Sequence, residues 1–507
     1  MTRAARLASG AALALALVAC GDGGKGPGDD DGTADPDGGA SSGGDAAVNA
    51  CETDGIPAGG ICRDGDVARC VDGDRVETED CGAGSCVALG DTATCLSLEA
   101  CADVGPLGRC DGDVLWRCDD GPALTDCAAG GKVCGYTDDT AGYACVDAGT
   151  AGTFVVRGTM RWEDRPLSPG ELGAPTPVPG RGAMVAVLDD ANDLTLATAS
   201  ASDDGSFTLR YTAAAGARVR VAAYSRSRAT VRPARVRDAS GYLHASGSPA
   251  FTAGDTAPVD LLVTAANNAA AWNALDNMVR GMDLVRAHGV PSISPLIVYW
   301  QLGSATGSYY QGGANELHLD GDDGYDDVVA LHEFGHYMQD EYSASDNPGG
   351  AHDGSPADPR LAWGEGGATW FAIAARGVPY YIDYAAGGGW SVELEDRVHA
   401  ASITSAMSQN ISEWMVAEVM WDVSDGALDG DGDPVALGGR AEVFEVMVGY
   451  LVDATARDRG RAGVDLVDWL DGWFMHHGMA SCGGMRTLLR ERYRFPYDFA
   501  GPAGTCP

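Results

Sequence analysis

The stretch His332-Glu333-Phe334-Gly335-His336 decides how the C-terminal half of the chain folds. On a helix, positions i and i+4 lie one turn apart on the same face, so His332 and His336 can bind one metal ion together. Zinc accepts neutral imidazole nitrogens in tetrahedral geometry, and Glu333 can act as a base on the water at the metal. The context favours a helix, because Asp326-Asp327 suit a helix N-terminus and the apolar residues that follow keep mostly to one side. The sequence therefore predicts a zinc site with Glu333 as its base.

Two histidines leave the metal short of a third protein ligand. A metzincin would place a histidine six residues after His336, where Tyr342 stands. The apolar-rich stretch Leu361–Ala372 predicts a second helix that carries Glu365, and the Gly- and Pro-rich segment before it predicts a loop. We therefore expect Glu365 to be the third ligand. The other candidates by residue type are Glu341, His352 and Asp353.

Helix, loop and helix with a glutamate on the second helix resembles the gluzincins. Trp363-Gly-Glu-Gly366 followed by Trp370-Phe371-Ala372 is similar to the third-ligand helix of thermolysin- and fungalysin-like metallopeptidases, and Trp414–Asp422 is similar to the helix that follows in fungalysin-like enzymes. The resemblance covers roughly Ala271 to Gly426. It implies peptide-bond hydrolysis, and it implies that Asn315–Leu319 forms a strand that pairs with extended substrate.

One position departs from the thermolysin-like pattern. There, an aspartate four residues after the third ligand orients a zinc-bound histidine, whereas this chain has Thr369. Asp340, Asp326 or a backbone carbonyl are the alternatives for that role. The group that stabilises the oxyanion is not chosen by spacing. The candidates by residue type are Tyr380, Tyr381, Tyr384, His399, His476 and His477.

The N-terminal segment predicts export. Arg3 and Arg6 precede an apolar run from Ala11 to Val18, which is too short to span a bilayer and is typical of a signal peptide over residues 1–19. The run ends in Leu17-Val-Ala-Cys20, which resembles the lipobox of bacterial lipoproteins. With Gly21 next, this implies an outer membrane lipoprotein that is lipidated at Cys20 and faces the periplasm or the cell surface. Residues 20–50 are almost wholly Gly, Asp, Ser, Ala and Pro, so we expect a disordered spacer.

Cysteines dominate the next segment. Twelve of the 15 cysteines fall between Cys51 and Cys145, in two sets of six with similar spacing. Modules this short cannot build large cores, so the pattern predicts two disulfide-bonded repeats, over residues 51–98 and 99–148, each pairing its own six cysteines. Zinc binding is disfavoured because no CxxC pair occurs. Cys482 and Cys506 are then left to pair with each other.

Residues 152–265 have the pattern of a small β-sandwich. From Phe154 to Trp162, apolar and polar residues alternate with the period of a strand that buries one face. Val156-Arg-Gly-Thr-Met and Asp204-Gly-Ser-Phe207 resemble the carboxypeptidase regulatory-like sandwich domains, which implies a supporting role. Further strands are expected at Ala183–Leu188, Ser206–Tyr211 and Arg218–Tyr224, with a turn at Asp203–Ser206.

The formal net charge of −39 at pH 7 disfavours nucleic acid and anionic lipid headgroups as partners, so we expect membrane contact through the lipid on Cys20 only. Asp429-Gly-Asp-Gly-Asp433 has the alternating carboxylates of a Ca²⁺ loop. Pro434 and Arg440 stand where an EF-hand needs Gly and Glu, so a solvated turn is favoured. The oligomeric state is left open.

The sequence thus predicts a multidomain protein: two Cys-rich repeats, a β-sandwich, and a mostly α (α+β) zincin-type catalytic domain over residues 268–507. The predicted function is a lipid-anchored, extracytoplasmic zinc peptidase that acts on peptides or proteins. The alternative is a surface binding or adhesion lipoprotein that keeps zinc structurally. Thr369 favours the alternative, and the intact Glu333 argues against it.

Overall fold

The computed structural model describes residues 51–507 except 52–54, 72–74, 83, 91, 98–100, 102–103, 105–107, 112, 119–120, 139–141, 148–151, 215, 230, 306, 386–387, 396–405, 426–436 and 453–458. The expected signal peptide, lipidated Cys20 and spacer lie outside the described residues, as do His399 and the Asp429–Asp433 loop. Within the described part, no helix combines the length and the apolar character that crossing a bilayer requires.

Each Cys-rich repeat is a three-stranded antiparallel sheet followed by a two-stranded hairpin. The strands of the first are β1 (Ile61–Arg63), β2 (Asp66–Val71), β3 (Arg75–Glu79), β4 (Ser85–Leu89) and β5 (Thr92–Leu96). Those of the second are β6 (Arg109–Asp111), β7 (Val114–Arg117), β8 (Ala123–Asp126), β9 (Lys132–Asp138) and β10 (Gly142–Asp147). The buried apolar cluster of the second repeat is small, so covalent links must supply much of its stability.

Those links follow one scheme in both repeats: the first cysteine pairs with the third, the second with the fifth, and the fourth with the sixth. The bridges are Cys51–Cys70, Cys62–Cys86, Cys81–Cys95, Cys101–Cys118, Cys110–Cys134 and Cys127–Cys145. The prediction that each repeat pairs its own cysteines is confirmed. Disulfides persist in oxidising compartments, so the bridges indicate a protein that works outside the cytoplasm.

Two sheets form the sandwich. In the first, β11 (Gly152–Asp164) pairs with β14 (Thr176–Pro179), β17 (Ser206–Ala213) and β22 (Val259–Val263). Phe207, Leu209 and Tyr211 alternate inward along β17, which is the period-two pattern of a strand that buries one face. The second sheet begins with β16 (Thr195–Ser200), β15 (Ala183–Asp189), β18 (Arg218–Ser227) and β19 (Ala234–Arg237). The smaller strands are β12 (Leu167–Ser168), β13 (Glu171–Leu172), β20 (Ala245–Gly247) and β21 (Phe251–Thr252).

The second sheet continues past residue 265. β19 pairs in parallel with β23 (Leu296–Trp300), β23 pairs in parallel with β25 (Glu316–Leu319), and β24 (Tyr309–Gln311) lies antiparallel at the end. The result is one nine-stranded sheet. A single cluster of buried apolar residues also runs from the sandwich into the helices. The sandwich therefore supplies part of the platform on which the later helices pack.

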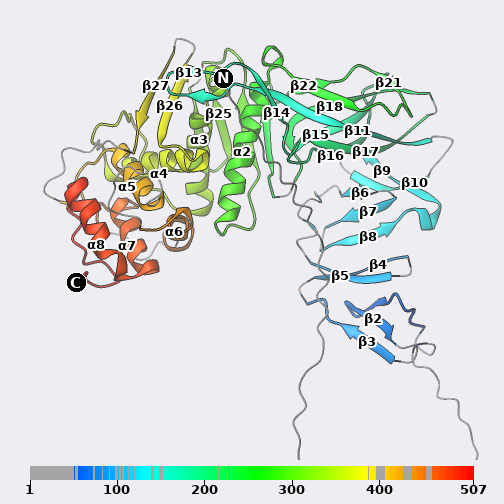
Figure 1. Ribbon diagram of the computed structural model, residues 1–507, viewed down its shortest axis with the longest axis horizontal. Coiled ribbons are helices and arrows are strands. Elements are labelled where there is room, and N and C mark those ends of the chain that lie inside the picture. The colour runs from blue at the N-terminus through cyan, green and yellow to red at the C-terminus, as the bar shows by residue number, and fades with distance from the viewer. Residues whose placement is uncertain are drawn as a thin grey trace, which may run out of the picture. The chain divides into compact units, whose positions relative to one another are not determined.

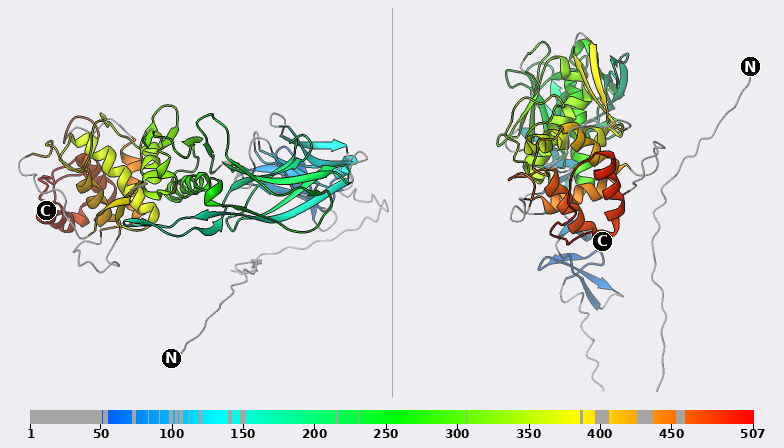
Figure 2. Two further views of the ribbon diagram at one scale, coloured as in Figure 1. Left: turned by 90° about the horizontal axis from the view of Figure 1, so that it is seen from above. Right: turned by 90° about the vertical axis from the view of Figure 1, so that its left-hand side faces the viewer.

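The long helices follow residue 269 and gather near the C-terminus (Figures 1 and 2). Helix α3 lies beside α4, and α5 packs against α4 on its other side (Figure 1). The helices are α2 (Ala270–Ala287), α3 (Asp327–Tyr342), α4 (Pro359–Arg376), α5 (Glu413–Ser424), α6 (Arg440–Glu445), α7 (Leu466–His477) and α8 (Cys482–Arg486). A hairpin of β26 (Tyr380–Ala385) and β27 (Gly388–Glu393) follows α4.

Cys482, at the start of α8, forms a disulfide with Cys506 across a sequence separation of 24 residues. This confirms the predicted pair. The chain-entropy model gives a loop of that length roughly 3 kcal/mol of stabilisation. The bridge fixes the last segment of the chain to the helical layer.

Candidate metal centre

Helix α3 places two histidines and a glutamate together because its start is fixed. Asp326 is the N-cap, and its carboxylate accepts hydrogen bonds from the backbone N–H groups of Val328 and Val329, both at 3.0 Å. From there the helix runs without a break through His332 and His336. Both imidazoles therefore leave the same face of α3, as their i, i+4 spacing predicts.

Helix α4 begins equally sharply and carries Glu365. Asp358 caps it, Pro359 occupies the first turn, and Gly377 ends it in the left-handed conformation. Small residues let α4 approach α3 closely: a Cβ on Gly335 would lie 2.7 Å from the Cα of Ala368. The glycine within the HExxH stretch is thus a packing requirement of the helix pair.

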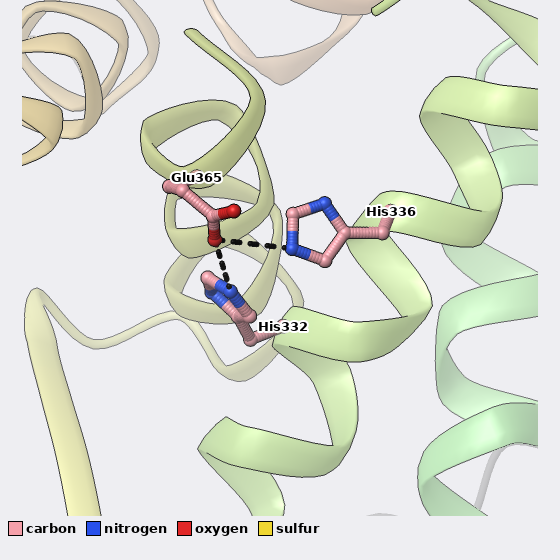
Figure 3. A group of neighbouring side chains, drawn as sticks. All are labelled: His332, His336 and Glu365. Atoms are coloured by element: carbon pink, nitrogen blue, oxygen red, sulfur yellow. Dashed lines mark hydrogen bonds and ion pairs between the residues drawn. The ribbon is translucent and has the colours of Figure 1, made fainter. Parts of the chain in front are cut away.

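The three expected ligands converge (Figure 3). Nε2 of His332 and Nε2 of His336 each lie 3.2 Å from Oε2 of Glu365. His332 is 5% exposed, Glu365 6%, and their ligating atoms and that of His336 all lie within 4.8 Å of one another. The side chains come from two helices and meet at one point.

This geometry fits a zinc ion. With bonds of roughly 2.0–2.1 Å, tetrahedral coordination separates neighbouring donors by about 3.3 Å, which agrees with the distances between the ring nitrogens and the carboxylate oxygen. Burial alone would raise the pKa of Glu365, but the two imidazoles outweigh burial and hold that pKa well below its usual range. The carboxylate is therefore an anionic donor, which is what a dication requires beside two neutral imidazoles.

Two further side chains orient the ligands. Oγ1 of Thr369 lies 3.1 Å from Nδ1 of His332, and the Asn347 amide donates to Oε1 of Glu365 at 2.8 Å. Thr369 therefore occupies the orienting role itself. The alternatives are engaged elsewhere, because Asp340 accepts a hydrogen bond from Tyr310 and Asp326 caps α3. A neutral hydroxyl replaces the carboxylate of the thermolysin-like pattern.

A Thr369→Val variant tests that contact. Valine keeps the shape of threonine but removes the hydroxyl, so the ring of His332 loses the partner that fixes its orientation. We expect zinc affinity to fall about 10–100-fold, the range seen when such outer partners of metal ligands are removed. Competition with a chromogenic chelator measures it, and unchanged affinity would show that Thr369 does not orient His332.

The rival third ligands fall into two groups. Glu341 is exposed on α3, and Asp353 is exposed and accepts a hydrogen bond from the N–H of Ser355. His352 instead reaches the centre: its Nε2 lies 3.6 Å from Oε2 of Glu365, and its Nδ1 lies 3.1 Å from Oε2 of Glu413. The group whose ligating atoms converge consists of His332, His336 and Glu365, so His352 lies next to that group without being part of it.

Glu413 is a site residue that the sequence did not reveal. It begins α5, is 5% exposed, and also accepts a hydrogen bond from the N–H of Gly354 at 3.0 Å. Its hydrogen bond to His352 raises the pKa of that imidazole to about 9. The loop that carries His352 is thereby fixed to α5 with a charged histidine facing the ligands.

The hairpin β26–β27 brings one expected tyrosine to the site. The ring of Tyr381 lies 5.8 Å from that of His332 and packs against Trp390 and Trp414. The backbone N–H of Tyr384 instead donates to Asp326, at 2.7 Å.

Three other candidates for stabilising the oxyanion have different surroundings. His476 packs beside Tyr450, and His477 lies against Trp473 with its Nε2 3.2 Å from the carbonyl of Glu442. Tyr380 forms the start of β26. Within the described residues, none of the three forms a hydrogen bond, an ion pair or a ring contact with His332, His336 or Glu365.

Asp326 belongs to a second convergent group of carboxylates, with Asp323 and Asp383, whose oxygens lie within 4.8 Å of one another. Burial raises the pKa of Asp326 to about 8 and that of Asp323 to about 6. Through Asp326 this group connects the start of α3 to β26. It therefore fixes β26, the strand that carries Tyr381, to the start of α3.

The expectation that Asn315–Leu319 pairs with substrate is wrong. β25 is hydrogen-bonded to β23 on one side and to β24 on the other, so both of its backbone edges are occupied. The outermost strand on this side of the sheet is β24. An added strand could pair only there.

Comparison with known proteins gives one family match over part of the chain. Residues 286–464 match the family described as Mycolysin C-terminal domain, a segment that contains the HExxH stretch, Glu365 and Glu413. No curated protein matches the chain. A 9R-lipoxygenase structure from Cyanothece is similar at 13% identity over 27% of this chain and 24% of that chain, but its TM-score of 0.13 supports no argument about the fold. The family match suggests that the chain is a peptidase-related protein.

Proposed function

We propose that this protein is an extracytoplasmic zinc peptidase of gluzincin type, with His332, His336 and Glu365 as zinc ligands and Glu333 as general base. The observation that carries the proposal is the convergence of three buried donors from α3 and α4 at 3.2 Å spacing. Residues 268–507 would form the catalytic domain, and a lipid on Cys20 would hold it to the outer membrane. The substrate would be a peptide or protein.

When bound, the zinc ion supplies a Lewis acid for hydrolysis of a peptide bond. Glu333, 7% exposed, would accept a proton from the attacking water and pass it to the leaving amine. Glu365 raises the pKa of His336 against the effect of burial, and Glu413 raises that of His352; the nearby carboxylate of Glu333 adds a smaller effect to each. A purely structural metal site has no need of a base in that position. The presence of Glu333 therefore favours an enzyme over a binding protein.

His352 is the donor best placed to stabilise negative charge on the substrate oxygen. Glu413 binds its Nδ1, so its protonated Nε2 faces the side of Glu365 where the ligands converge. A preorganised charged donor of this kind contributes when charge develops in the transition state. His352 would therefore stabilise the oxyanion while Glu333 transfers the proton from the water to the leaving amine.

A His352→Gln variant should lower kcat by about 10²- to 10³-fold, as the loss of one oxyanion donor does. Zinc content should stay the same, because His352 is not one of the three ligands. Asp353→Asn, a neighbouring change on the exposed loop, is the control and should leave kcat unaltered. Loss of zinc from the His352 variant would instead make this histidine a ligand.

Peptidase assay of the purified protein decides between enzyme and binding protein. Cleavage of an unbiased peptide library should be abolished by a chelator and restored by stoichiometric Zn²⁺. A protein that binds one Zn²⁺ tightly and cleaves nothing in the library would contradict the proposal.

A further inference from the structure

A cavity of about 700 Å³ lies between the second Cys-rich repeat and the sandwich, away from the proposed catalytic site. Its wall includes residues of β6, β16 and β17, and Arg286 near the end of α2. The volume lies within the range of about 300–1,000 Å³ that is usual for small-molecule sites. Nothing in the proposed peptidase mechanism uses this cavity.

The lining is basic in a protein that is strongly acidic. Five of the 19 lining residues are arginines and one, Asp203, is acidic. The whole chain has 34 Lys and Arg against 73 Asp and Glu among 507 residues. The cavity lining thus reverses the charge balance of the chain as a whole, and screening over about 8 Å at physiological salt keeps such a local field distinct.

Two of the five arginines are neutralised by the protein itself. Arg210 pairs with Asp113 at 2.9 Å, and Arg232 pairs with Asp203 and Asp283 at 2.8 and 2.7 Å. These pairs fix the wall but leave little charge for a ligand.

The other three arginines form no ion pair with a carboxylate in the described part of the chain. The guanidinium of Arg109 stacks over Trp116 at 4.9 Å, and that of Arg228 lies over Tyr143 at 5.8 Å. The Nε atoms of Arg109 and Arg286 are buried without a hydrogen-bond partner. Stacking holds the guanidinium faces of Arg109 and Arg228 and leaves their N–H edges for an acceptor, and the buried Nε of Arg109 and that of Arg286 have no acceptor among the described residues.

We propose that this cavity binds a small ligand that carries at least two oxyanion groups. Guanidinium forks match carboxylate and phosphate oxygens, and three of them around one cavity select for multiple negative charge over a single one. Citrate represents the polycarboxylates and pyrophosphate the phosphates. Acetate, with one charge, should bind at least tenfold more weakly than either.

Calorimetric titration of the full-length protein with each probe, at 0.15 M salt, tests the proposal. We expect saturable binding of citrate or pyrophosphate with one site per chain, and the tighter of the two identifies the ligand class. Fluorescence of Trp116, beneath Arg109, should change with the same midpoint. No saturable binding of either probe up to 10 mM would overturn the proposal.

The double variant R228Q/R286Q should weaken binding at least tenfold while leaving the reporter pair of Arg109 and Trp116 in place. The matched control is R157Q/R161Q, which removes the same charge from exposed positions on β11 and should change affinity less than twofold. Equal weakening by both variants would mean general charge attraction and overturn the site. R228K/R286K keeps the charge without the fork, and it must also bind more weakly if the arginines act as proposed.

Discussion

A Glu333→Gln variant is expected to retain about one Zn²⁺ per chain and to lose peptidase activity by 10²- to 10⁴-fold, the range that general acid–base catalysis contributes. Glutamine has the size of glutamate but cannot accept the proton of the attacking water. The three ligands are untouched, so metal binding should not change. Metal analysis of the dialysed protein and kcat on the best library peptide measure the two effects separately.

Glu341→Gln is the matched control for that variant, because it makes the same chemical change on the exposed side of the same helix. It should alter neither zinc content nor kcat. If Glu333→Gln kept full activity, the proton would be moved by another group and the proposed mechanism would be wrong. If it lost zinc, Glu333 would contribute to metal binding.

Glu365→Gln should produce the largest loss of metal affinity. The change removes the anionic donor on which both imidazole nitrogens converge and leaves two neutral ligands. Loss of an outer partner costs 10–100-fold in affinity, so loss of a ligand should exceed about 100-fold. Competitive titration with a zinc chelator gives the affinity, and activity should return in part at high Zn²⁺ concentration.

Asn347→Ala is informative beside it, since the Asn347 amide donates to the other oxygen of Glu365, Oε1, at 2.8 Å. The zinc affinity of Asn347→Ala should lie between that of the wild type and that of Glu365→Gln. A Glu365→Gln protein with full zinc occupancy and full activity would remove Glu365 from the site, and His352 would become the ligand to test.

Part of the site could be predicted because its spacing is local. The separation of His332 from His336 is one helical turn, and Glu365 lies in a helix that its own apolar pattern predicts. Asn347 and Glu413 could not be predicted in the same way. They approach the ligands from a loop without periodicity and from a helix far along the chain, and only the folded arrangement brings them there.

For the fold, too, the locally encoded features could be predicted and the long-range ones could not. Alternation marked β11, further strands were expected where β15, β17 and β18 lie, and an even set of cysteines marked each repeat, because these signals lie within short stretches. Strand partners are not encoded locally, so the sequence did not show that β25 is enclosed on both sides. Nor did it show that β19 of the sandwich joins β23.

That junction has a consequence for how the protein can be divided. A chain cut to residues 268–507 would keep every proposed zinc ligand, yet it would lack the neighbour that covers one edge of β23 from Leu296 to Tyr299. The N–H and C=O groups of an uncovered strand invite pairing with other chains, and all five residues of β23 have apolar or aromatic side chains. By covering this edge of β23, strand β19 of the sandwich prevents the aggregation that we expect of the isolated residues 268–507.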